Sequence, residues 1–356
     1  MAITMFNKEF DPNTITPDNG NYFGVALDPE KAALVLISAP WDLTASLRTG
    51  SSYAPDAVIE ASRYVDFYEP LAPNTWRKGI ATAPIDYSIQ DLSHRLRSDA
   101  EGVIKMHDEL GMSVLDNLMY ERRLRRVNEG SVEVNDNIFK QASYWLERDK
   151  IVGLVGGDQS VSYGMVRALG YKYEKLGVLH IDSKCDMHEA YQGFDFSHAS
   201  TMYNILRDVP QVEKLVAVGV QEFSPIEWER AVSDKRVSLF TAQDIWSRQF
   251  EGDTWANIVN GIIDELPNDV YLSLDIDGLE NECSPNRGHL TAGGLGFHQV
   301  VFLMERIVAS GRRIVGFDIT EVVPSMENKA EIRIVARLLF KMCSMALKSV
   351  DSPMIM

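Results

Sequence analysis

Short apolar runs alternate with amphipathic stretches along most of the chain, which is the pattern of strands and helices in an α/β protein. The apolar runs predict buried strands at residues 32–39, 79–85, 151–155, 176–182, 214–220, 237–241, 270–277 and 313–321. Helical spacing predicts helices at 55–62, over most of 90–148, and at 162–169, 200–206, 225–232, 255–265, 299–309 and 329–348. This alternation predicts a mostly parallel sheet that is covered by helices on both faces.

The same pattern indicates one domain behind an N-terminal arm. Residues 1–30 are rich in Asp, Asn, Pro and Gly, so we expect an extended arm that lies over the domain rather than a core element. Residues 31–350 contain no internal repeat and no linker that would mark a boundary. We therefore predict a single α/β domain over 31–350.

Composition narrows the class of partner. The formal net charge is −16, which argues against nucleic acid or an anionic membrane as a partner and is consistent with a small cationic ligand or simply with an acidic, soluble surface. Three widely spaced cysteines suggest a reducing compartment without a disulfide framework. The N-terminus lacks an apolar signal core and no apolar run is long enough to span a membrane, so we expect a cytoplasmic protein.

Four of the predicted strands have polar clusters at their carboxyl ends, at 156–159, 182–186, 275–277 and 318–321. In open parallel sheets the carboxyl ends of the strands form the functional site. Two of the clusters supply four carboxylates, those of Asp182, Asp186, Asp275 and Asp277. Four buried carboxylates repel one another and lose hydration, so a cation must lie among them. If the extended path continues past residue 182, alternation places Lys184 on the same side, and the cation is then either a metal ion or this ammonium group.

The four clusters resemble the motifs of the ureohydrolase family, which contains arginases, agmatinases and formiminoglutamases. They read Gly-Gly-Asp-Gln (156–159), Asp-Ser-Lys-Cys-Asp (182–186), Ser-Leu-Asp-Ile-Asp (273–277) and Asp-Ile-Thr-Glu-Val-Val-Pro (318–324). Phe-Ser-His-Ala-Ser (196–200) is similar to a further family motif, and the likeness covers about residues 32–348. The resemblance implies a three-layer αβα domain around an eight-stranded, mostly parallel sheet, assembled as homotrimers or homohexamers.

The resemblance also implies a centre of two Mn²⁺ ions and a ligand set for each. Carried over by motif, one ion would be held by Gln159, Asp182, Asp186 and Asp275, and the other by Asp182, Lys184, Asp275 and Asp277. In the family motifs a metal-binding histidine stands at the positions of Gln159 and Lys184, so both histidines are replaced here. Gln159 still offers a carbonyl oxygen, but a protonated Lys184 has no acceptor and would occupy the second ion's position itself. At most one ion is expected.

Other positions keep or lose family features. Glu321 matches the carboxylate that grips the guanidinium group, or forms a structural ion pair; His198 matches a proton shuttle, or caps the following helix. Arg287 and His289 stand in a changed substrate mouth, where Arg287 would repel a cationic substrate. We expect His180 to face the opposite side of its strand from Asp182.

Two functions follow. The first is a ureohydrolase-fold protein with a degenerate metal site, inactive or nearly inactive in guanidino hydrolysis, which serves a binding or regulatory role within a homo-oligomer or beside an active homologue. The second is a hydrolase that uses one metal ion on a guanidino, amidino or formimino compound. Metal content after incubation with Mn²⁺ separates the two.

Overall fold

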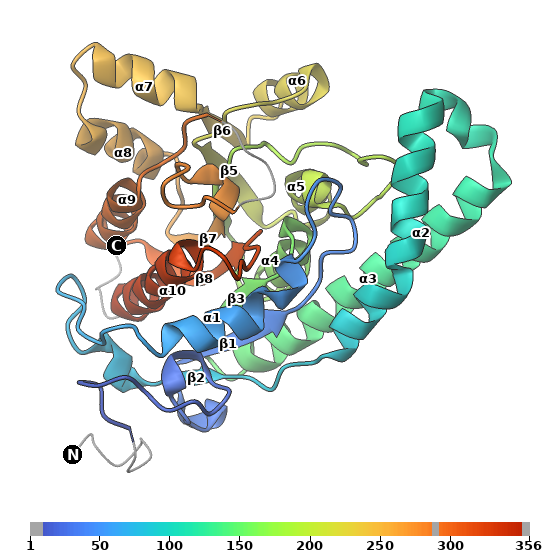
Figure 1. Cartoon of the computed structure of the whole chain (residues 1–356). Helices are drawn as coiled ribbons and strands as arrows, with labels where there is room; N and C mark the ends of the chain where they lie inside the picture. Colours follow the sequence, from blue (N-terminus) through green and yellow to red (C-terminus); the bar gives the residue numbers. More distant parts are fainter. Residues whose placement is uncertain (1–9, 287–291, 351–356) are drawn as a thin grey trace.

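A single parallel sheet of eight strands forms the centre of the computed structural model, which describes residues 10–286 and 292–350 (Figure 1). The strands are β1 Leu34–Ala39, β2 Ile80–Thr82, β3 Ile151–Gly156, β4 Leu176–Ile181, β5 Val212–Val218, β6 Val237–Phe240, β7 Asp269–Asp275 and β8 Arg313–Thr320. Their order across the sheet is β2-β1-β3-β8-β7-β4-β5-β6, and every neighbouring pair is parallel. The predicted eight-stranded α/β fold is confirmed.

Ten α-helices connect and cover these strands. They are α1 Ala54–Ser62, α2 Ser88–Leu110, α3 Leu118–Leu146, α4 Ser162–Lys172, α5 Thr201–Asp208, α6 Pro225–Ser233, α7 Ala242–Phe250, α8 Trp255–Asp264, α9 Phe297–Ala309 and α10 Ala330–Ser349, counted over the described residues. Helix α7 was not predicted. Ala242, Ile245, Trp246 and Phe250 do stand at helical spacing in α7, although only Ile245 is buried.

The helices form two layers, each with its own apolar core against one face of the sheet. Helices α1, α8, α9 and α10 cover one face, and α2, α3, α4 and α5 cover the other (Figure 1). Because both faces are buried, the central strands are mainly apolar, and most polar side chains gather where the strands end. His180, Ser273 and Asp318 are buried polar exceptions within the strands. None of the helices in the described part of the chain is long and apolar enough to cross a membrane.

The N-terminal arm contributes to the core, contrary to our expectation. Tyr22 and Phe23 are fully buried, and the Phe23 ring packs edge-on against Phe340 of α10 with 5.4 Å between ring centroids. The Tyr22 hydroxyl lies 2.8 Å from the Ser38 Oγ atom at the end of β1. The arm also buries Val25 and Leu27. Its apolar residues are interrupted by Asp, Asn, Pro and Gly, so the segment gave no strand or helix pattern.

Helices α2 and α3 form a long antiparallel hairpin along one side of the molecule (Figure 1). The Tyr120 hydroxyl of α3 donates a hydrogen bond to the carbonyl of Gln192, and Asn128 bonds to Asp195. These contacts fix the loop between β4 and α5 against the hairpin. The hairpin thereby forms one wall of the space above the carboxyl ends of the strands.

Candidate functional site

A cleft of about 620 Å³ opens at the carboxyl ends of β3, β4, β7 and β8. All eight sequence-predicted site residues within the described part of the chain line it, namely Gln159, Asp182, Lys184, Asp186, His198, Asp275, Asp277 and Glu321. The remaining two, Arg287 and His289, lie outside the described residues. The fold therefore brings together in one cavity side chains that come from five separate segments.

Each acidic strand end is shaped by a local hydrogen bond. The Asp182 Oδ1 atom accepts from the backbone N–H of Lys184 at 3.1 Å, and the Asp275 Oδ1 atom accepts from the backbone N–H of Asp277 at 2.7 Å. Such side-chain-to-backbone bonds turn the chain immediately after the strand. One oxygen of each carboxylate is thus used to hold the loop, and the second oxygen can face the cleft.

The two acidic loops are in close contact at Gly278. A Cβ atom at this position would lie 2.6 Å from the Asp182 Cα atom, closer than any real contact of this kind. Only glycine allows the loop after β7 to approach the loop after β4 so closely. This contact brings the Asp275 and Asp182 carboxylates into one cluster.

The cluster is electrostatically strained without a cation. Burial raises the pKa of Asp186 well above its usual range, and the neighbouring charges of Asp182 and Glu227 raise it further. Burial likewise raises the pKa of Asp275, with further contributions from Asp182 and Asp277. The pKa of Glu321 is raised by burial and by the Asp158 charge. The carboxylates therefore need bound protons, a metal ion or a cationic ligand.

Two of the acids also have unusual backbone conformations. Asp186 has φ of 53° and Glu321 has φ of 61°, both in the left-handed region that residues with side chains seldom adopt. Hydrogen bonds hold them there: the Asp186 carbonyl accepts from Met202 and Tyr203, and the Glu321 N–H donates to the Gly157 carbonyl. Such conformations often occur at functional sites, where surrounding structure offsets their cost.

Gln159 is buried and its side-chain amide is fully engaged. Its Nε2 atom donates to Ser273 Oγ at 2.9 Å, and its Oε1 atom accepts from the Thr320 hydroxyl. Its backbone N–H donates to Glu321 Oε1 at 2.8 Å. The carbonyl oxygen that we expected to offer to a metal ion is thus already hydrogen-bonded, and metal ligation by Gln159 stays a prediction.

Lys184 is placed differently from our expectation. Its ammonium group forms an ion pair of 2.5 Å with Glu222, and the side chain is 32% exposed on the cleft wall. The expected extended path does not continue, because the chain bends at residues 182–184 and breaks the alternation. Among the described residues, the Lys184 ammonium group therefore pairs with Glu222 and not with the carboxylates of the predicted metal site.

His180 is the residue that sequence reasoning placed wrongly. It is completely buried in β4, and its Nε2 atom lies 3.3 Å from Asp182 Oδ2 and 3.7 Å from Asp186 Oδ2. Residues two apart on a strand share a face, so alternation places His180 on the same side as Asp182, not the opposite one. The spacing of two residues already implied a shared face, and our expectation of opposite faces was wrong.

The other two described histidines of the cleft lie on its walls. His188, in the loop after β4, pairs with Glu227 in the first turn of α6, with 3.2 Å between its Nε2 atom and Glu227 Oε2. Although burial raises it, the pKa of Glu227 is lowered overall because His188 and Ser224 donate hydrogen bonds to its carboxylate. His198 lies at the start of the 3₁₀ turn His198–Ser200, with its ring 5.8 Å from that of Tyr191.

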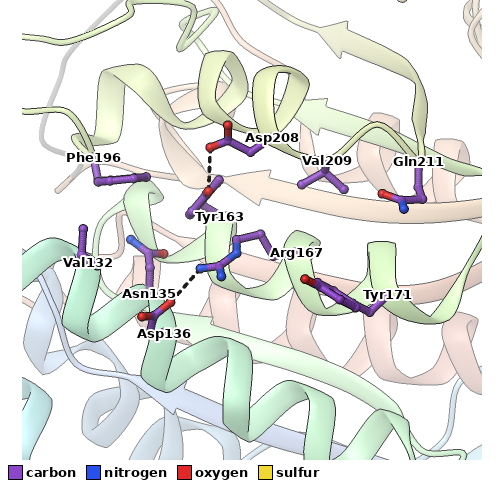
Figure 2. Close-up of a pocket in the computed structure, with 10 residues that line it drawn as sticks. All are labelled: Val132, Asn135, Asp136, Tyr163, Arg167, Tyr171, Phe196, Asp208, Val209 and Gln211. Atoms are coloured by element: carbon purple, nitrogen blue, oxygen red, sulfur yellow. Dashed lines mark hydrogen bonds and ion pairs between the residues drawn. The ribbon is translucent and has the colours of Figure 1, made fainter.

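A second hollow, of about 420 Å³, lies outside this site between α3, α4 and the end of α5. Figure 2 shows its two polar contacts: the Tyr163 hydroxyl donates to Asp208 at 2.7 Å, and Arg167 pairs with Asp136 at 2.9 Å. Each charged group drawn there already has a partner within the hollow. We therefore place the chemistry in the carboxylate cleft.

Comparison with known proteins agrees with this geometry. The model of the Arginase family matches residues 32–344. The chain belongs to the arginase family. It is 28% identical to N(1)-aminopropylagmatine ureohydrolase of Thermus thermophilus over 85% of this chain and 87% of that protein. It is 22% identical to the agmatinase of Bacillus cereus over 86% of this chain and 89% of that protein.

A solved member of the arginase family has the same fold. The agmatine ureohydrolase of Thermoplasma volcanium superposes with a TM-score of 0.66, covers 92% of this chain and 94% of its own, and is 22% identical. The arginase-like αβα architecture that the motifs implied is thereby confirmed.

Arginase-family enzymes typically depend on Mn²⁺, and the residues present fit one divalent ion. Within the described part of the chain, both ring nitrogens of His180 and the Oδ2 atom of Asp186 are buried without a hydrogen-bond partner. A bound divalent ion would lower the pKa of a water molecule and polarise a substrate. The sulfur-free donor set of imidazole and carboxylates suits Mn²⁺.

Proposed function

We propose that this arginase-family protein binds a small cationic amidine or guanidine compound in the carboxylate cleft, with at most one divalent ion, and is inactive or nearly inactive in two-metal guanidino hydrolysis. Its role would then be binding or regulation. The relatives are hydrolases of amidine or guanidine compounds, and we propose a ligand of the same chemical class for this protein. Its candidate metal centre differs from the family motifs at Gln159 and Lys184.

One observation carries the proposal. Asp182, Asp275 and Glu321 converge in a buried cluster whose carboxylates need a cation, while the two positions that carry metal-binding histidines in the family motifs hold Gln159 and Lys184. A planar amidinium group donates several hydrogen bonds in one plane and neutralises such a cluster. A two-ion centre, in contrast, lacks both of the nitrogen ligands on which the family pattern relies.

The chain's own residues suggest how a ligand would be oriented. Glu321 holds one oxygen to the Gln159 N–H and can accept from the ligand with the other. Two further acids line the cleft and already have partners: Glu222 pairs with Lys184, and the buried Glu227 pairs with His188. Asp108 on α2 adds a carboxylate on the facing wall. Among the residues that the structure describes, eight acidic side chains thus line the cleft against two basic ones, Arg48 and Lys184, and this excess favours a cationic ligand.

Calorimetric titration with agmatine tests the binding role. Metal-free protein should bind agmatine in a saturable way, and Glu321→Gln should weaken the affinity by about tenfold or more because a charged acceptor is lost. Glu174→Gln, on the exposed turn before β4, is the matched control and should leave the affinity unchanged. Equal binding by the parent and Glu321→Gln would count against the proposal.

A urea-release assay tests the expected lack of turnover. With saturating Mn²⁺ and either agmatine or arginine, we expect no release above background. Turnover at the rates of ordinary enzymes, about 1 s⁻¹ or more, would contradict the inactive role.

The second candidate is a hydrolase that works with one metal ion on a guanidino, amidino or formimino compound. The observation in its favour is that His180 joins Asp182 and Asp186, which supplies an imidazole nitrogen that the replaced motif positions lack. His198, on the cleft wall, would then move a proton to the leaving group. Slow, Mn²⁺-dependent turnover that His198→Gln abolishes would favour this candidate over the first.

Assembly is part of the same proposal. Like the family, the chain would form homotrimers or homohexamers, alone or beside an active homologue. Light scattering of the purified protein, which has a chain mass of 40.0 kDa, tests this: a monomeric mass would exclude the homo-oligomer.

A further inference from the structure

We infer that the protein holds one divalent transition-metal ion through a donor set centred on the His180 imidazole, with Asp182 and Asp186 as its carboxylate ligands. This inference rests on the proposed function in one respect: the ion is the single divalent ion that we propose for the cleft. It differs from the set implied by the motifs, in which the only non-carboxylate ligand at this position is Gln159. The nitrogen ligand comes instead from within β4.

The distances fit a single ion. The His180 Nε2 atom lies 3.3 Å from Asp182 Oδ2 and 3.7 Å from Asp186 Oδ2, and the three ligand atoms all lie within 4.8 Å of one another. Ligands that bind one ion at about 2.0–2.2 Å are themselves about 3.0–3.6 Å apart in octahedral or tetrahedral geometry. The side chains are therefore close to the required spacing and need only small rotations.

The hydrogen bonding points to a missing ligand. His180 is fully buried, and neither ring nitrogen has a hydrogen-bond partner among the residues that the structure describes. The Oδ2 atom of Asp186 is also buried and also lacks a hydrogen-bond partner among the described residues. A buried imidazole without a partner is costly, and so is a buried carboxylate oxygen. One ion between the two groups would satisfy the Nε2 atom of His180 and the Oδ2 atom of Asp186.

The backbone supports the three ligands rigidly. His180 is paired with Ser273 in the middle of the sheet, so its position is fixed by β4 and β7. Asp182 is held by the N–H of Lys184, and Asp186 by two N–H groups at the start of α5. Ligands on a rigid strand and on hydrogen-bonded loops are suited to metal binding because little ordering is required. Lys184 is turned away toward Glu222, so its ammonium leaves this position open.

A nitrogen ligand can be detected directly. Pulsed electron paramagnetic resonance on the full-length protein loaded with Mn²⁺ should show hyperfine coupling to a histidine nitrogen, and labelling all histidines with ¹⁵N should change its pattern. His180→Gln should abolish the coupling and weaken Mn²⁺ binding by about tenfold to a hundredfold. His188→Gln, a histidine of the same cleft that pairs with Glu227, is the matched control and should retain both.

A second variant keeps the test informative if His180→Gln fails to fold. In a protein in which His188, His198 and His289 are all replaced by Gln, the nitrogen coupling should persist. Loss of the coupling in this triple variant would overturn the inference, as would coupling that survives in His180→Gln. A third contrary result is weaker binding by His180→Gln without any nitrogen coupling in the parent, since His180 would then only orient Asp182 through a hydrogen bond.

The outcomes are separable from those of the proposed function. A protein that binds no Mn²⁺ but still binds agmatine in its metal-free form overturns this inference alone. A protein that shows the nitrogen coupling but does not bind agmatine overturns the proposed ligand class and leaves the metal site in place.

Discussion

At the scale of single residues, the two replaced histidine positions behave differently. Gln159 is locked by Ser273 and Thr320 inside the core, so its change from the family pattern is absorbed by new hydrogen bonds. Lys184 instead reaches the cleft wall and pairs with Glu222. Gln159 is thus part of the buried hydrogen bonding, whereas Lys184 adds a partly exposed charge beside the site. Replacing each residue should therefore change the free energy of unfolding by a different amount.

Lys184→Ala should change the free energy of unfolding by only about 0–1 kcal/mol, because the pair with Glu222 is partly exposed and screened by water. A lysine embedded among the buried carboxylates would instead cost about 3–5 kcal/mol on removal. Urea denaturation of Lys184→Ala, Glu222→Ala and the double variant measures the coupling. A loss above about 3 kcal/mol for Lys184→Ala alone would place its ammonium among the carboxylates in solution.

Gln159→His combined with Lys184→His should raise Mn²⁺ stoichiometry to two ions per chain, since each change restores a nitrogen ligand of the family motif. Lys184→His should contribute more, because it also removes a positive charge from the cleft. Gln159→His alone should lower the melting temperature of metal-free protein, because the bonds to Ser273 and Thr320 are lost. Calorimetry with Mn²⁺ provides the stoichiometry; an unchanged value would show that these positions do not support a second ion. Urea release from agmatine should return weakly or not at all.

At the scale of elements, the site depends on how closely the loops after β4 and β7 approach. Each loop is formed locally by an Asp that bonds to a backbone N–H two residues later. Their contact is not local, since it needs Gly278 against the Asp182 backbone. The carboxylate cluster therefore depends on the packing of two strand ends that are adjacent in the sheet but far apart in sequence.

Gly278→Ala should destabilise the protein by about 1–3 kcal/mol and weaken Mn²⁺ binding, because the added Cβ atom forces the two loops apart. Gly261→Ala in α8 is the control: its Cβ atom would lie 3.7 Å from Phe240, an ordinary contact, and alanine favours the helix by about 0.5–1 kcal/mol. Glycine-to-alanine substitution should thus lower the free energy of unfolding at position 278 and raise it at position 261. Thermal melts with and without Mn²⁺ measure both, and stabilisation by Gly278→Ala would contradict the close contact.

At the scale of the whole molecule, the arm and the last helix close one apolar layer. Phe23 packs against Phe67 and Phe340, and Tyr22 reaches Ser38 at the end of β1. Described residues of the predicted arm therefore belong to the apolar core, while the division at residue 30 stays a prediction. The fold needs the arm for part of its core.

Phe23→Ala should cost about 3–5 kcal/mol, the usual loss for a buried aromatic ring. Its φ of 59° is equally unfavourable for both residues, so the loss reports the ring and not the backbone. Ile15→Ala in the same arm, where the side chain is 62% exposed, should change stability by less than about 0.5 kcal/mol. Chemical denaturation separates the two; similar values for both would mean that the arm is not part of the core.

The eight strands, most of the helices and the four acidic strand ends could be predicted from the sequence, because apolar periodicity and turn residues are local properties. The family motifs added the identity of the fold. Local reasoning failed where the chain bends: at residues 182–184 an Asp side chain captures a backbone N–H, so the alternation that placed Lys184 among the carboxylates ends there.

Which side chains meet in the cleft could not be predicted from local sequence and follows from how distant segments pack. Glu222 and the arm residue Phe23 carry no periodic signal, and their partners lie far away in sequence. The environment of His180 depends on the loop that returns Asp186 to the end of β4. The face of β4 on which His180 lies, in contrast, follows from the alternation of side chains along a strand. Long-range contacts of this kind depend on how loops pack at the sheet edge, and no short stretch of sequence encodes that packing.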